Sequence, residues 1–371
     1  MKVLHVYKSY YPDTVGGIEQ VIAQLCTSLH TLGDESRIFT LSPRPVPSVL
    51  LRPEGEVHRC RTTVEISSNP LSISAFAEFR RQLRWADVVH YQFPWPFADL
   101  LHMTCARGKP SVVSYQSDIV RQKWLLRAYA PLMKMFLRSV DAVVTTSPQY
   151  RDSSSVLQEL GRDVRVIPNG INEASYPSPP QTSVDGWRSL VGEGFFLFVG
   201  VLRYYKGLET LLRAAKGFGG KIVIAGTGPE LGHLQEHATR EGLDNVRFVG
   251  SISDEDKMCL LRLARAFVFP SHLRSEAFGM SLLEAAMCAK PMICCEIGTG
   301  TSYINADGET GFVVPPEDPA ALRAAMERLR GDDGAAAALG RAARARLEAH
   351  FTAQEMARAY HALYREIAKA S

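Results

Sequence analysis

The sequence contains no long apolar run. No stretch of about 18 consecutive apolar residues occurs in it, which is the length that a helix needs to cross a bilayer. The first residues, MKVLHVYKSYYP, have the pattern of a short strand and a turn, and they lack the apolar segment of a secretory signal peptide. We therefore expect a cytoplasmic protein without a membrane-spanning helix.

Charge of one sign and paired cysteines are also scarce. The formal net charge is only +3, which argues against a nucleic-acid-binding protein with a broad basic face. The seven cysteines are an odd number and show no C-x-x-C spacing, so we expect reduced thiols in the core of a cytosolic protein. No repeat of the solenoid type is visible.

What the sequence does contain is a regular alternation of short apolar runs with amphipathic stretches. Its 371 residues, 46% of them hydrophobic, suit two globular domains of roughly 150 to 200 residues each. Strands are predicted at 3–7, 37–41, 87–91, 111–115, 142–146, 164–167, 195–201, 221–225, 246–249, 266–269 and 292–295. Strands that alternate with helices indicate parallel sheets covered on both faces.

The stretch from Asn169 to Trp187 is rich in proline, serine and glycine, which marks the predicted break between the domains. We expect one Rossmann-like domain over residues 1–175 and a second over 176–351, with the carboxyl ends of both sheets meeting at a cleft. A last helix over 352–371 is expected to pack back on the first domain.

The stretch SEAFGMSLLEAA carries two glutamates, Glu276 and Glu284, on either side of a glycine. Helical periodicity begins only after the glycine, which places Glu276 in a loop and Glu284 in the first turns of a helix. The residues at the start of that helix are Phe278, Gly279, Met280 and Ser281. Their backbone N–H groups would favour an anion, because they lie at the positive end of the helix dipole.

A diphosphate bound there would have one carboxylate on each side, and each can accept hydrogen bonds from sugar hydroxyls. This arrangement predicts a nucleotide-sugar site, in which Glu276 holds the transferred sugar and Glu284 holds the ribose. The alternative is structural: Glu276 caps the helix and Glu284 is a solvated surface residue.

Two other segments favour the nucleotide sugar. In DTVGGIEQVI, Gly16 and Gly17 lie between the first strand and its helix, on the cleft side, although glycines there are usually only a turn. In FVGVLRYYKGLETLL, Arg203 and Lys206 follow the first strand of the second domain. They would stabilise the charge that develops on a leaving diphosphate. The alternative is a pair of solvated basic side chains.

In this order, the GG loop, G-x-x-R-x-x-K-G, GTGPE, SEAFGMSLLEA and TGFVVPPED resemble the retaining glycosyltransferases of family 4. The resemblance covers nearly the whole chain and is most specific in the second domain. It implies an α/β fold of the GT-B type, with two Rossmann-like domains facing each other across a cleft. Residues 1–175 would bind the acceptor and residues 176–351 the nucleotide sugar. The family usually has arginine directly after the glycine, whereas here Arg203 would supply the guanidinium.

A second departure from the family lies at the end of the fourth major strand. Close members usually read Y-H-S-D there, and the histidine reaches the donor sugar, whereas this chain has Gln116 in the sequence YQSD. Glutamine can exchange hydrogen bonds with a sugar hydroxyl but cannot titrate. Either Gln116 only orients the sugar, or the protein binds a nucleotide sugar with weak or absent transfer. Asp118 would orient the acceptor or cap a helix beginning at Ile119.

The resemblance further implies front-face transfer, in which the acceptor hydroxyl attacks from the side that the diphosphate leaves. No metal or other cofactor is then required, because Arg203, Lys206 and helix amides neutralise the diphosphate. The sequence DED at 254–256 is expected to start a helix rather than to bind a metal. In mannosyl-transferring relatives the residue matching Asp254 can pair with a guanine edge and the one matching Lys257 lies near the base, which favours a GDP-linked donor.

The acceptor is indicated by two segments of the first domain. Residues 121–140 combine basic with apolar and aromatic side chains and contain no acid. Such a stretch can lie on an anionic membrane, here the inner face of the cytoplasmic membrane, which suits a lipid-linked acceptor, or it can be an ordinary helix whose lysines snorkel. In HYQFPWPFADL, Trp95 can stack on a sugar in an acceptor channel or belong to a buried loop.

Together these features predict a hexosyltransferase of bacterial surface polysaccharide synthesis. It would move mannose, or a deoxyhexose such as rhamnose, from a GDP-linked donor to a lipid-linked or oligosaccharide acceptor.

Overall fold

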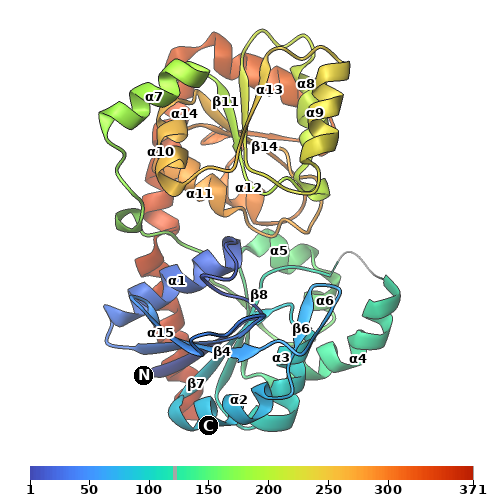
Figure 1. The fold of residues 1–371 in the computed structure, drawn as a ribbon, viewed down its shortest axis with the longest axis vertical. Coiled ribbons are helices and arrows are strands. Elements are labelled where there is room, and N and C mark those ends of the chain that lie inside the picture. The colour runs from blue at the N-terminus through green and yellow to red at the C-terminus, as the bar shows by residue number, and fades with distance from the viewer. Residues whose placement is uncertain (120–122, 371) are drawn as a thin grey trace. The chain divides into compact units, whose positions relative to one another are not determined.

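The computed structural model describes residues 1–119 and 123–370. The chain forms two compact units, each built around its own sheet (Figure 1). Unit 1 comprises Met1–Ile171 together with the chain from Thr352 onward, and unit 2 comprises Asn172–Phe351. The sequence placed these boundaries after residues 175 and 351.

Unit 1 contains an eight-stranded sheet in the order β10-β9-β8-β7-β1-β2-β4-β3. Its strands are β1 (Lys2–Val6), β2 (Glu35–Ser42), β3 (Val49–Arg52), β4 (Gly55–Arg61), β7 (Val88–Phe93), β8 (Ser111–Tyr115), β9 (Ala142–Thr145) and β10 (Val164–Val166). All neighbours pair in parallel except β3, which runs antiparallel to β4. A separate hairpin is formed by β5 (Val64–Ile66) and β6 (Asn69–Leu71). The sequence did not predict β3 to β6.

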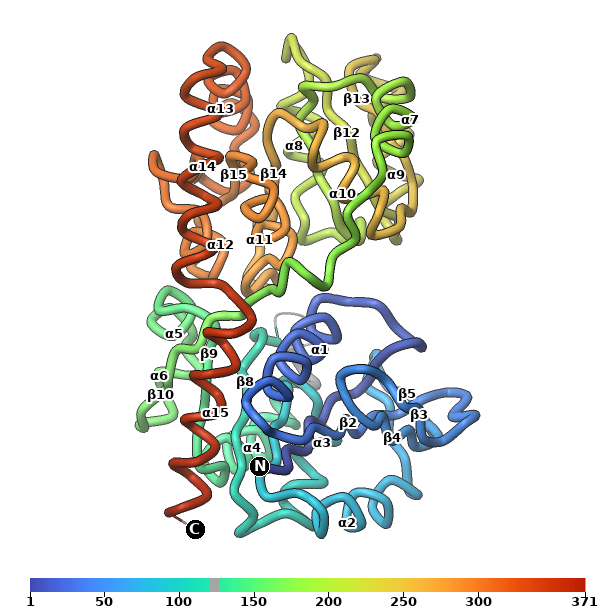
Figure 2. The backbone as a smooth tube through the Cα atoms, turned by 90° about the vertical axis from the view of Figure 1, so that its left-hand side faces the viewer, coloured from blue at the N-terminus to red at the C-terminus, as the bar shows by residue number. Residues whose placement is uncertain are grey.

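The helices of unit 1 are α1 (Gly17–His30), α2 (Ala75–Trp85), α3 (Pro96–Leu101), α4 (Lys123–Ser139), α5 (Pro148–Ser153), α6 (Ser155–Gln158) and α15 (Ala353–Ala370), with a π-helical turn at His102–Ala106. The C-terminal helix α15 runs along unit 1 (Figure 2) and packs against α1. His361 on α15 lies 2.7 Å from the Asp34 carboxylate, which also accepts a hydrogen bond from the N-terminal ammonium group at 2.6 Å.

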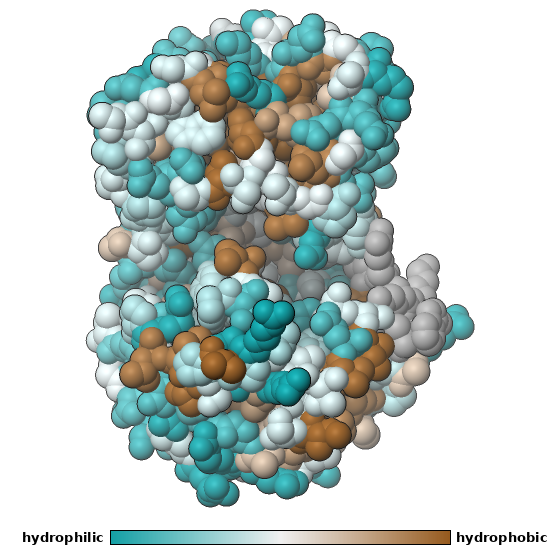
Figure 3. Space-filling view, viewed as in Figure 1, coloured by the Kyte–Doolittle hydropathy of each residue, from teal (hydrophilic) through white to brown (hydrophobic). Residues whose placement is uncertain are grey.

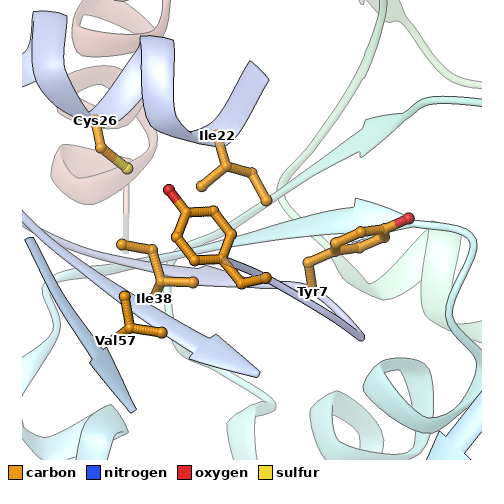
Figure 4. Close-up of a cluster of buried hydrophobic side chains, with 6 residues drawn as sticks. Tyr7, Ile22, Cys26, Ile38 and Val57 are labelled. Carbon is orange, nitrogen blue, oxygen red and sulfur yellow. The ribbon is translucent and has the colours of Figure 1, made fainter. Parts of the chain in front are cut away.

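Helix α1 forms because its apolar residues recur at helical spacing and face the sheet. Ile22 and Cys26 on α1 pack against Ile38 of β2 and Val57 of β4, and all four are completely buried (Figure 4). Burying an aliphatic side chain of this size stabilises the fold by about 1.5–3 kcal/mol. The α1 face therefore anchors the start of the helix at Gly17 and the loop before it, which ends at Gly16.

Unit 2 contains a six-stranded sheet in the order β13-β12-β11-β14-β15-β16, with every neighbour parallel. Its strands are β11 (Phe196–Val199), β12 (Ile222–Ala225), β13 (Val246–Gly250), β14 (Ala266–Phe269), β15 (Met292–Cys295) and β16 (Gly311–Val314). Its helices are α7 (Gln181–Val191), α8 (Leu208–Ala215), α9 (Leu231–Arg240), α10 (Asp254–Leu263), α11 (Met280–Met287), α12 (Gly300–Ile304), α13 (Pro319–Gly331) and α14 (Asp333–His350).

The direction of strand addition reverses between β11 and β14, because β12 and β13 lie on one side of this pair and β15 and β16 on the other. In open parallel sheets, ligands bind beyond the carboxyl ends of the strands at such a reversal. The loops after β11 and β14 are therefore the first place to look for a site in unit 2.

On the side seen in Figure 3, apolar residues are scattered in small patches among polar ones. Exposed aliphatic side chains such as Val46, Leu51 and Ile73 belong to unit 1. Within the residues that the structure describes, no helix is long and apolar enough to span a bilayer.

Candidate active site

The loop after β14 leads into α11 through a glycine. Gly279 has φ +101° and precedes the first helical residue, Met280, and only glycine adopts this conformation without strain. The N–H groups of residues 278–281 make no hydrogen bond within the described part of the chain. Four unsatisfied donors at the positive end of a helix form a ready site for an anion.

Beside this helix start, Lys206 and Glu276 form an ion pair. The Lys206 Nζ atom lies 2.5 Å from Glu276 Oε2, and the two side chains are only 11% and 12% exposed. Ser271 donates a further hydrogen bond to Glu276 Oε2 at 3.3 Å. Glu276 is therefore not the helix cap of the structural alternative, because its carboxylate is bonded to Lys206 from the loop after β11 and to Ser271 of its own loop.

A glycine also brings the two loops together. Gly207 has φ +68°, and a Cβ atom on it would lie 1.9 Å from the carbonyl oxygen of Pro270. Only glycine permits this approach of the chain after β11 to the chain after β14. The contact places Lys206, the residue before this glycine, next to Glu276.

The second glutamate has its own lysine. Glu284 on α11 is buried, and its Oε1 atom accepts hydrogen bonds from Lys257 Nζ at 2.7 Å and from Tyr176 at 3.1 Å. Lys257 also lies 2.8 Å from the Asp254 carboxylate. Burial alone would lower the pKa of Lys257, but the attraction of Glu284 and Asp254 outweighs it and raises the pKa. Glu284 is thus buried and bonded to a lysine, and it is not the solvated surface residue of the structural alternative.

The acidic run at 254–256 begins a helix, as predicted. Ser253 and Asp256 form a reciprocal capping box at the start of α10, and Asp256 also accepts a hydrogen bond from Trp187 at 2.8 Å. Hydrogen bonds from Ser253 and Trp187 lower the pKa of Asp256. Among the residues that the structure describes, no group of three or more His, Cys, Asp or Glu side chains could hold a metal ion.

The two predicted cations, Arg203 and Lys206, differ in burial and in their contacts. Lys206 is buried in its ion pair, whereas Arg203 is exposed and makes no ion pair or side-chain hydrogen bond with any described residue. Of these two cations, Lys206 is therefore the one that the fold holds in place, and Arg203 is free to turn toward a ligand.

In unit 1, Gly16 and Gly17 lie at the start of α1 as the sequence indicated. The carboxylate of Glu19 is buried beside them, and a Cβ atom on Gly16 would lie 2.6 Å from Glu19 Oε2. Glu19 accepts hydrogen bonds from Ser9 at 3.0 Å and Thr14 at 2.6 Å. The sequence reasoning missed this carboxylate, which makes the α1 start unfavourable for a second anion.

Gln116 lies directly after β8 and is buried. Its Nε2 atom donates to Gln92 Oε1 at 2.8 Å. Asp118 accepts hydrogen bonds from the hydroxyls of Tyr115 at 2.9 Å and Ser154 at 2.8 Å. Ile119 is not helical, and residues 120–122, which a cap at Asp118 would precede, lie outside the described residues, so both roles of Asp118 stay predictions.

Of the two interpretations of Trp95, stacking on an acceptor sugar is wrong and burial is confirmed. Its side chain is completely buried and donates a hydrogen bond to the carbonyl oxygen of Pro70 at 3.1 Å. The aromatic run around it is packed core: Trp95 and Phe97 have ring centroids 5.7 Å apart. An aromatic run predicts burial and sugar stacking equally well, and here the hairpin β5–β6 covers it.

The basic stretch 121–140 is described in part, because residues 120–122 lie outside the described residues. In α4, Met133, Phe136 and Leu137 are buried, as in an ordinary domain helix, and Lys134 pairs with Glu159 at 2.9 Å. Met135, Arg127 and Arg138 are exposed. Over residues 127–139, α4 thus has one buried side and one exposed side, which carries both basic and apolar residues.

Comparison with known proteins identifies the family of this chain. Residues 15–175 match the model for Glycosyltransferase Family 4, and residues 185–346 match that for Glycosyl transferases group 1. The chain is 52% identical, over 95% of its length and 93% of the relative's, to D-rhamnosyltransferase WbpZ of Pseudomonas aeruginosa. The chain is a glycosyltransferase of family 4. It is also 45% identical, over 98% of both chains, to O-antigen chain mannosyltransferase C of Escherichia coli.

Solved structures agree on the fold of this glycosyltransferase. Sucrose-phosphate synthase from Thermosynechococcus elongatus matches it with a TM-score of 0.83 at 23% identity, over 100% of both chains. The Anabaena protein HepE, solved in complex with UDP, matches with a TM-score of 0.79 at 17% identity, over 99% of this chain and 100% of HepE. The fold is therefore GT-B, with a parallel sheet in each of two α/β domains, as the sequence predicted.

Proposed function

We propose that this glycosyltransferase moves a hexose, either mannose or a deoxyhexose such as rhamnose, from a GDP-linked donor to a growing bacterial surface glycan, with retention at the sugar carbon. Its two relatives at 52% and 45% identity are named as a rhamnosyltransferase and an O-antigen mannosyltransferase, and both align over nearly the whole chain. The acceptor we propose is a lipid-linked or oligosaccharide chain.

The start of α11 is the observation that carries this proposal. Its unsatisfied N–H groups and the neighbouring Lys206–Glu276 pair offer charge of both signs at one place. A diphosphate accepts hydrogen bonds from the amides and from Lys206, and Glu276 accepts them from hydroxyls of the transferred sugar. Arg203 adds a second cation.

The chemistry follows from the charge that develops as the sugar leaves. Negative charge grows on the departing diphosphate, and fixed donors at that position lower the barrier. The acceptor hydroxyl attacks from the same side, and its proton passes to the departing phosphate. We propose a reaction without metal or other cofactor, since Lys206, Arg203 and the α11 amides supply the positive charge.

Glu284, Lys257 and Asp254 form the proposed nucleoside end of the site. Glu284 accepts hydrogen bonds from the ribose hydroxyls, and its position on α11 one turn into the helix supports this role. Asp254 is 73% exposed and carries acceptor oxygens only, which suit the adjacent N–H donors of a guanine edge. Tyr176, whose ring lies 5.3 Å from Lys257 Nζ, borders the same group and was not anticipated from the sequence.

For unit 1 we propose that the backbone of Gly16 and Gly17 and the amide of Gln116 contact the sugar of the donor rather than its diphosphate, and that Asp118 contacts the acceptor. We also propose that the basic side of 121–140 rests on anionic lipid at the inner face of the cytoplasmic membrane. Exposed Arg127, Met135 and Arg138 support this contact, because cations and apolar groups on one side of a helix favour a membrane interface.

A thermal-shift screen with GDP, UDP and ADP tests the donor first. A ligand at 100 times its Kd stabilises the folded protein by about 2.7 kcal/mol, and we expect the largest shift with GDP. Transfer from GDP-mannose and GDP-rhamnose to a lipid-linked acceptor is then measured for the wild type and for Gln116→His. Activity in the wild type supports the proposal, and the absence of both transfer and hydrolysis in both proteins would refute it.

A further inference from the structure

A buried hydrogen-bond chain connects Gln116 to the C-terminal helix α15. Its members come from β7, β8, the residue directly after β8, and α15, and none is more than 5% exposed. They are Gln116, Gln92, His90, Ser114, Tyr360 and Tyr364. Buried polar groups bonded to one another in this way rigidify the region that contains them.

The chain runs in three steps. Gln116 Nε2 donates to Gln92 Oε1 at 2.8 Å, and Gln92 Nε2 lies 3.3 Å from His90 Nε2. The other ring nitrogen of His90 lies 2.7 Å from the hydroxyl of Tyr364 on α15. Since His90 and Gln92 are two residues apart on β7, both project from the same face of the sheet.

A side branch completes the bonding of His90. Ser114 Oγ lies 2.7 Å from His90 Nε2 and 2.5 Å from the hydroxyl of Tyr360. On the far side of Gln116, Asn169 Nδ2 lies 3.5 Å from Gln116 Oε1. The nitrogen and the oxygen of the Gln116 amide therefore have different partners, Gln92 and Asn169.

The direction of the chain follows from the charge state of His90. Burial and the neighbouring His5 hold the pKa of His90 well below its usual value, so the ring is neutral, with one donor and one acceptor nitrogen. The Gln92 amide nitrogen can only donate, so His90 Nε2 accepts and Nδ1–H donates to Tyr364. This tautomer is the one that fits the orientation of both amides.

A glutamine at position 116 depends on hydrogen-bond partners for its orientation more than a histidine would. The terminal torsion of a glutamine is broad and nearly two-fold, and a half-turn exchanges its N–H donors for its carbonyl acceptor. Nothing within the Gln116 side chain selects one orientation. The partners around it do so.

We propose that Gln92 and Tyr364 are positioning residues for sugar transfer, which act through His90 to hold the Gln116 amide in a single orientation. This inference rests on the proposed function, in which Gln116 contacts the donor sugar. It extends the active site to α15 and gives that helix a part in the reaction as well as in the packing of unit 1.

A kinetic double-mutant cycle with Gln92→Met and Gln116→Met tests the inference, using GDP-mannose and GDP-rhamnose as donors. We expect Gln92→Met to lower kcat about tenfold and to change the donor KM by less than about threefold. In the Gln116→Met background the same substitution is expected to have no further effect on kcat, because its action passes through Gln116.

Tyr364→Phe provides a second variant that removes one hydroxyl and keeps the ring. It is expected to lower kcat in the wild type and to have no effect in Gln116→Met. Gln82→Met is the matched control, since Gln82 is a buried, hydrogen-bonded glutamine of unit 1 outside the chain. It should lower the melting temperature without lowering kcat.

The inference would be overturned if Gln92→Met and Tyr364→Phe lowered kcat as much in the Gln116→Met background as in the wild type. The proposed function would be unaffected by that result. A Tyr364→Phe enzyme with wild-type kcat would likewise overturn the inference alone. A wild type that neither transfers nor hydrolyses either donor would instead refute the proposed function, and this inference with it.

Discussion

Lys206 and Glu276 are 70 positions apart in the sequence, and their charged atoms lie 2.5 Å apart in unit 2. The lysine follows β11 and the glutamate follows β14, the two strands between which the sheet reverses its order. A buried ion pair contributes little net stability, because desolvation offsets the attraction. Its place beside the unsatisfied amides of α11 fits a binding role better than a structural one.

The first prediction concerns the sugar-binding carboxylate. Glu276→Gln keeps a hydrogen-bond acceptor for Lys206 but removes the charge that binds sugar hydroxyls. We expect kcat/KM for the GDP-sugar to fall about 10- to 100-fold, as for the loss of a charged hydrogen bond, and the affinity for GDP to change less than about threefold. Steady-state kinetics and calorimetry measure the two quantities. Unchanged kcat/KM would contradict the proposed role of Glu276.

The second prediction concerns the approach of two loops at Gly207. In Gly207→Ala, the added Cβ meets the Pro270 carbonyl oxygen, which must move Lys206. We expect a loss of about 1–3 kcal/mol in the free energy of unfolding from backbone strain and weaker GDP binding. The matched control is Gly242→Ala, because Gly242 also has a positive φ but no atom within 4 Å of an added Cβ. Gly242→Ala should lower the free energy of unfolding without weakening GDP binding. If Gly207→Ala and Gly242→Ala bound GDP with equal affinity, the proposed role of the Gly207 contact would be contradicted.

The third prediction concerns the buried pair of Lys257 and Glu284. Lys257→Met leaves Glu284 buried without its cation, which costs about 3–5 kcal/mol in such pairs. Adding Glu284→Gln removes the stranded charge, so the double variant should be more stable than Lys257→Met alone. Chemical denaturation measures this order. A double variant less stable than the single one would show that Glu284 is not held by Lys257.

The fourth prediction concerns pH and the core of unit 1. His5 is completely buried, its two ring nitrogens have no hydrogen-bond partner among the described residues, and burial, the largest effect, lowers the pKa of His5 to about 3. The unfolded chain, with a histidine pKa near 6.5, binds this proton first. Protonation of His5 therefore has no effect on the free energy of unfolding above about pH 6.5. It lowers this free energy progressively as the pH falls from 6.5 towards 3.

His5→Leu removes this proton-binding site. We expect its free energy of unfolding to fall less steeply with pH than that of the wild type, by about 1.4 kcal/mol per pH unit between pH 6 and 4. The slope will not vanish, because the pKa of the neighbouring His90 is lowered as well. Parallel curves for the two proteins would mean that His5 does not titrate on unfolding.

Local features of the site could be predicted from the sequence. The change of period at Gly279 correctly separated the loop that carries Glu276 from the helix that carries Glu284. Acids in the first turn correctly placed the start of α10 at Asp254. Both predictions depend on the pattern of neighbouring residues, which the local backbone follows.

Contacts between distant segments could not be predicted in this way. The hydrogen bond from Tyr176 to Glu284 spans 108 positions, and the pairing of Lys206 with Glu276 depends on β11 and β14 being neighbours in the sheet. Strand β3 was missed because it is an edge strand with exposed aliphatic residues, whose pattern does not separate a strand from a loop. Trp95 was misjudged because composition does not distinguish an aromatic core from a binding surface.

The most direct test of the account is calorimetric titration of the wild type and Lys206→Met with GDP and GMP. If the α11 start and Lys206 bind a diphosphate, the wild type should prefer GDP to GMP, and Lys206→Met should weaken GDP binding about 10- to 100-fold while changing GMP binding much less. The account would be contradicted if Lys206→Met bound GDP as tightly as the wild type and still preferred GDP to GMP.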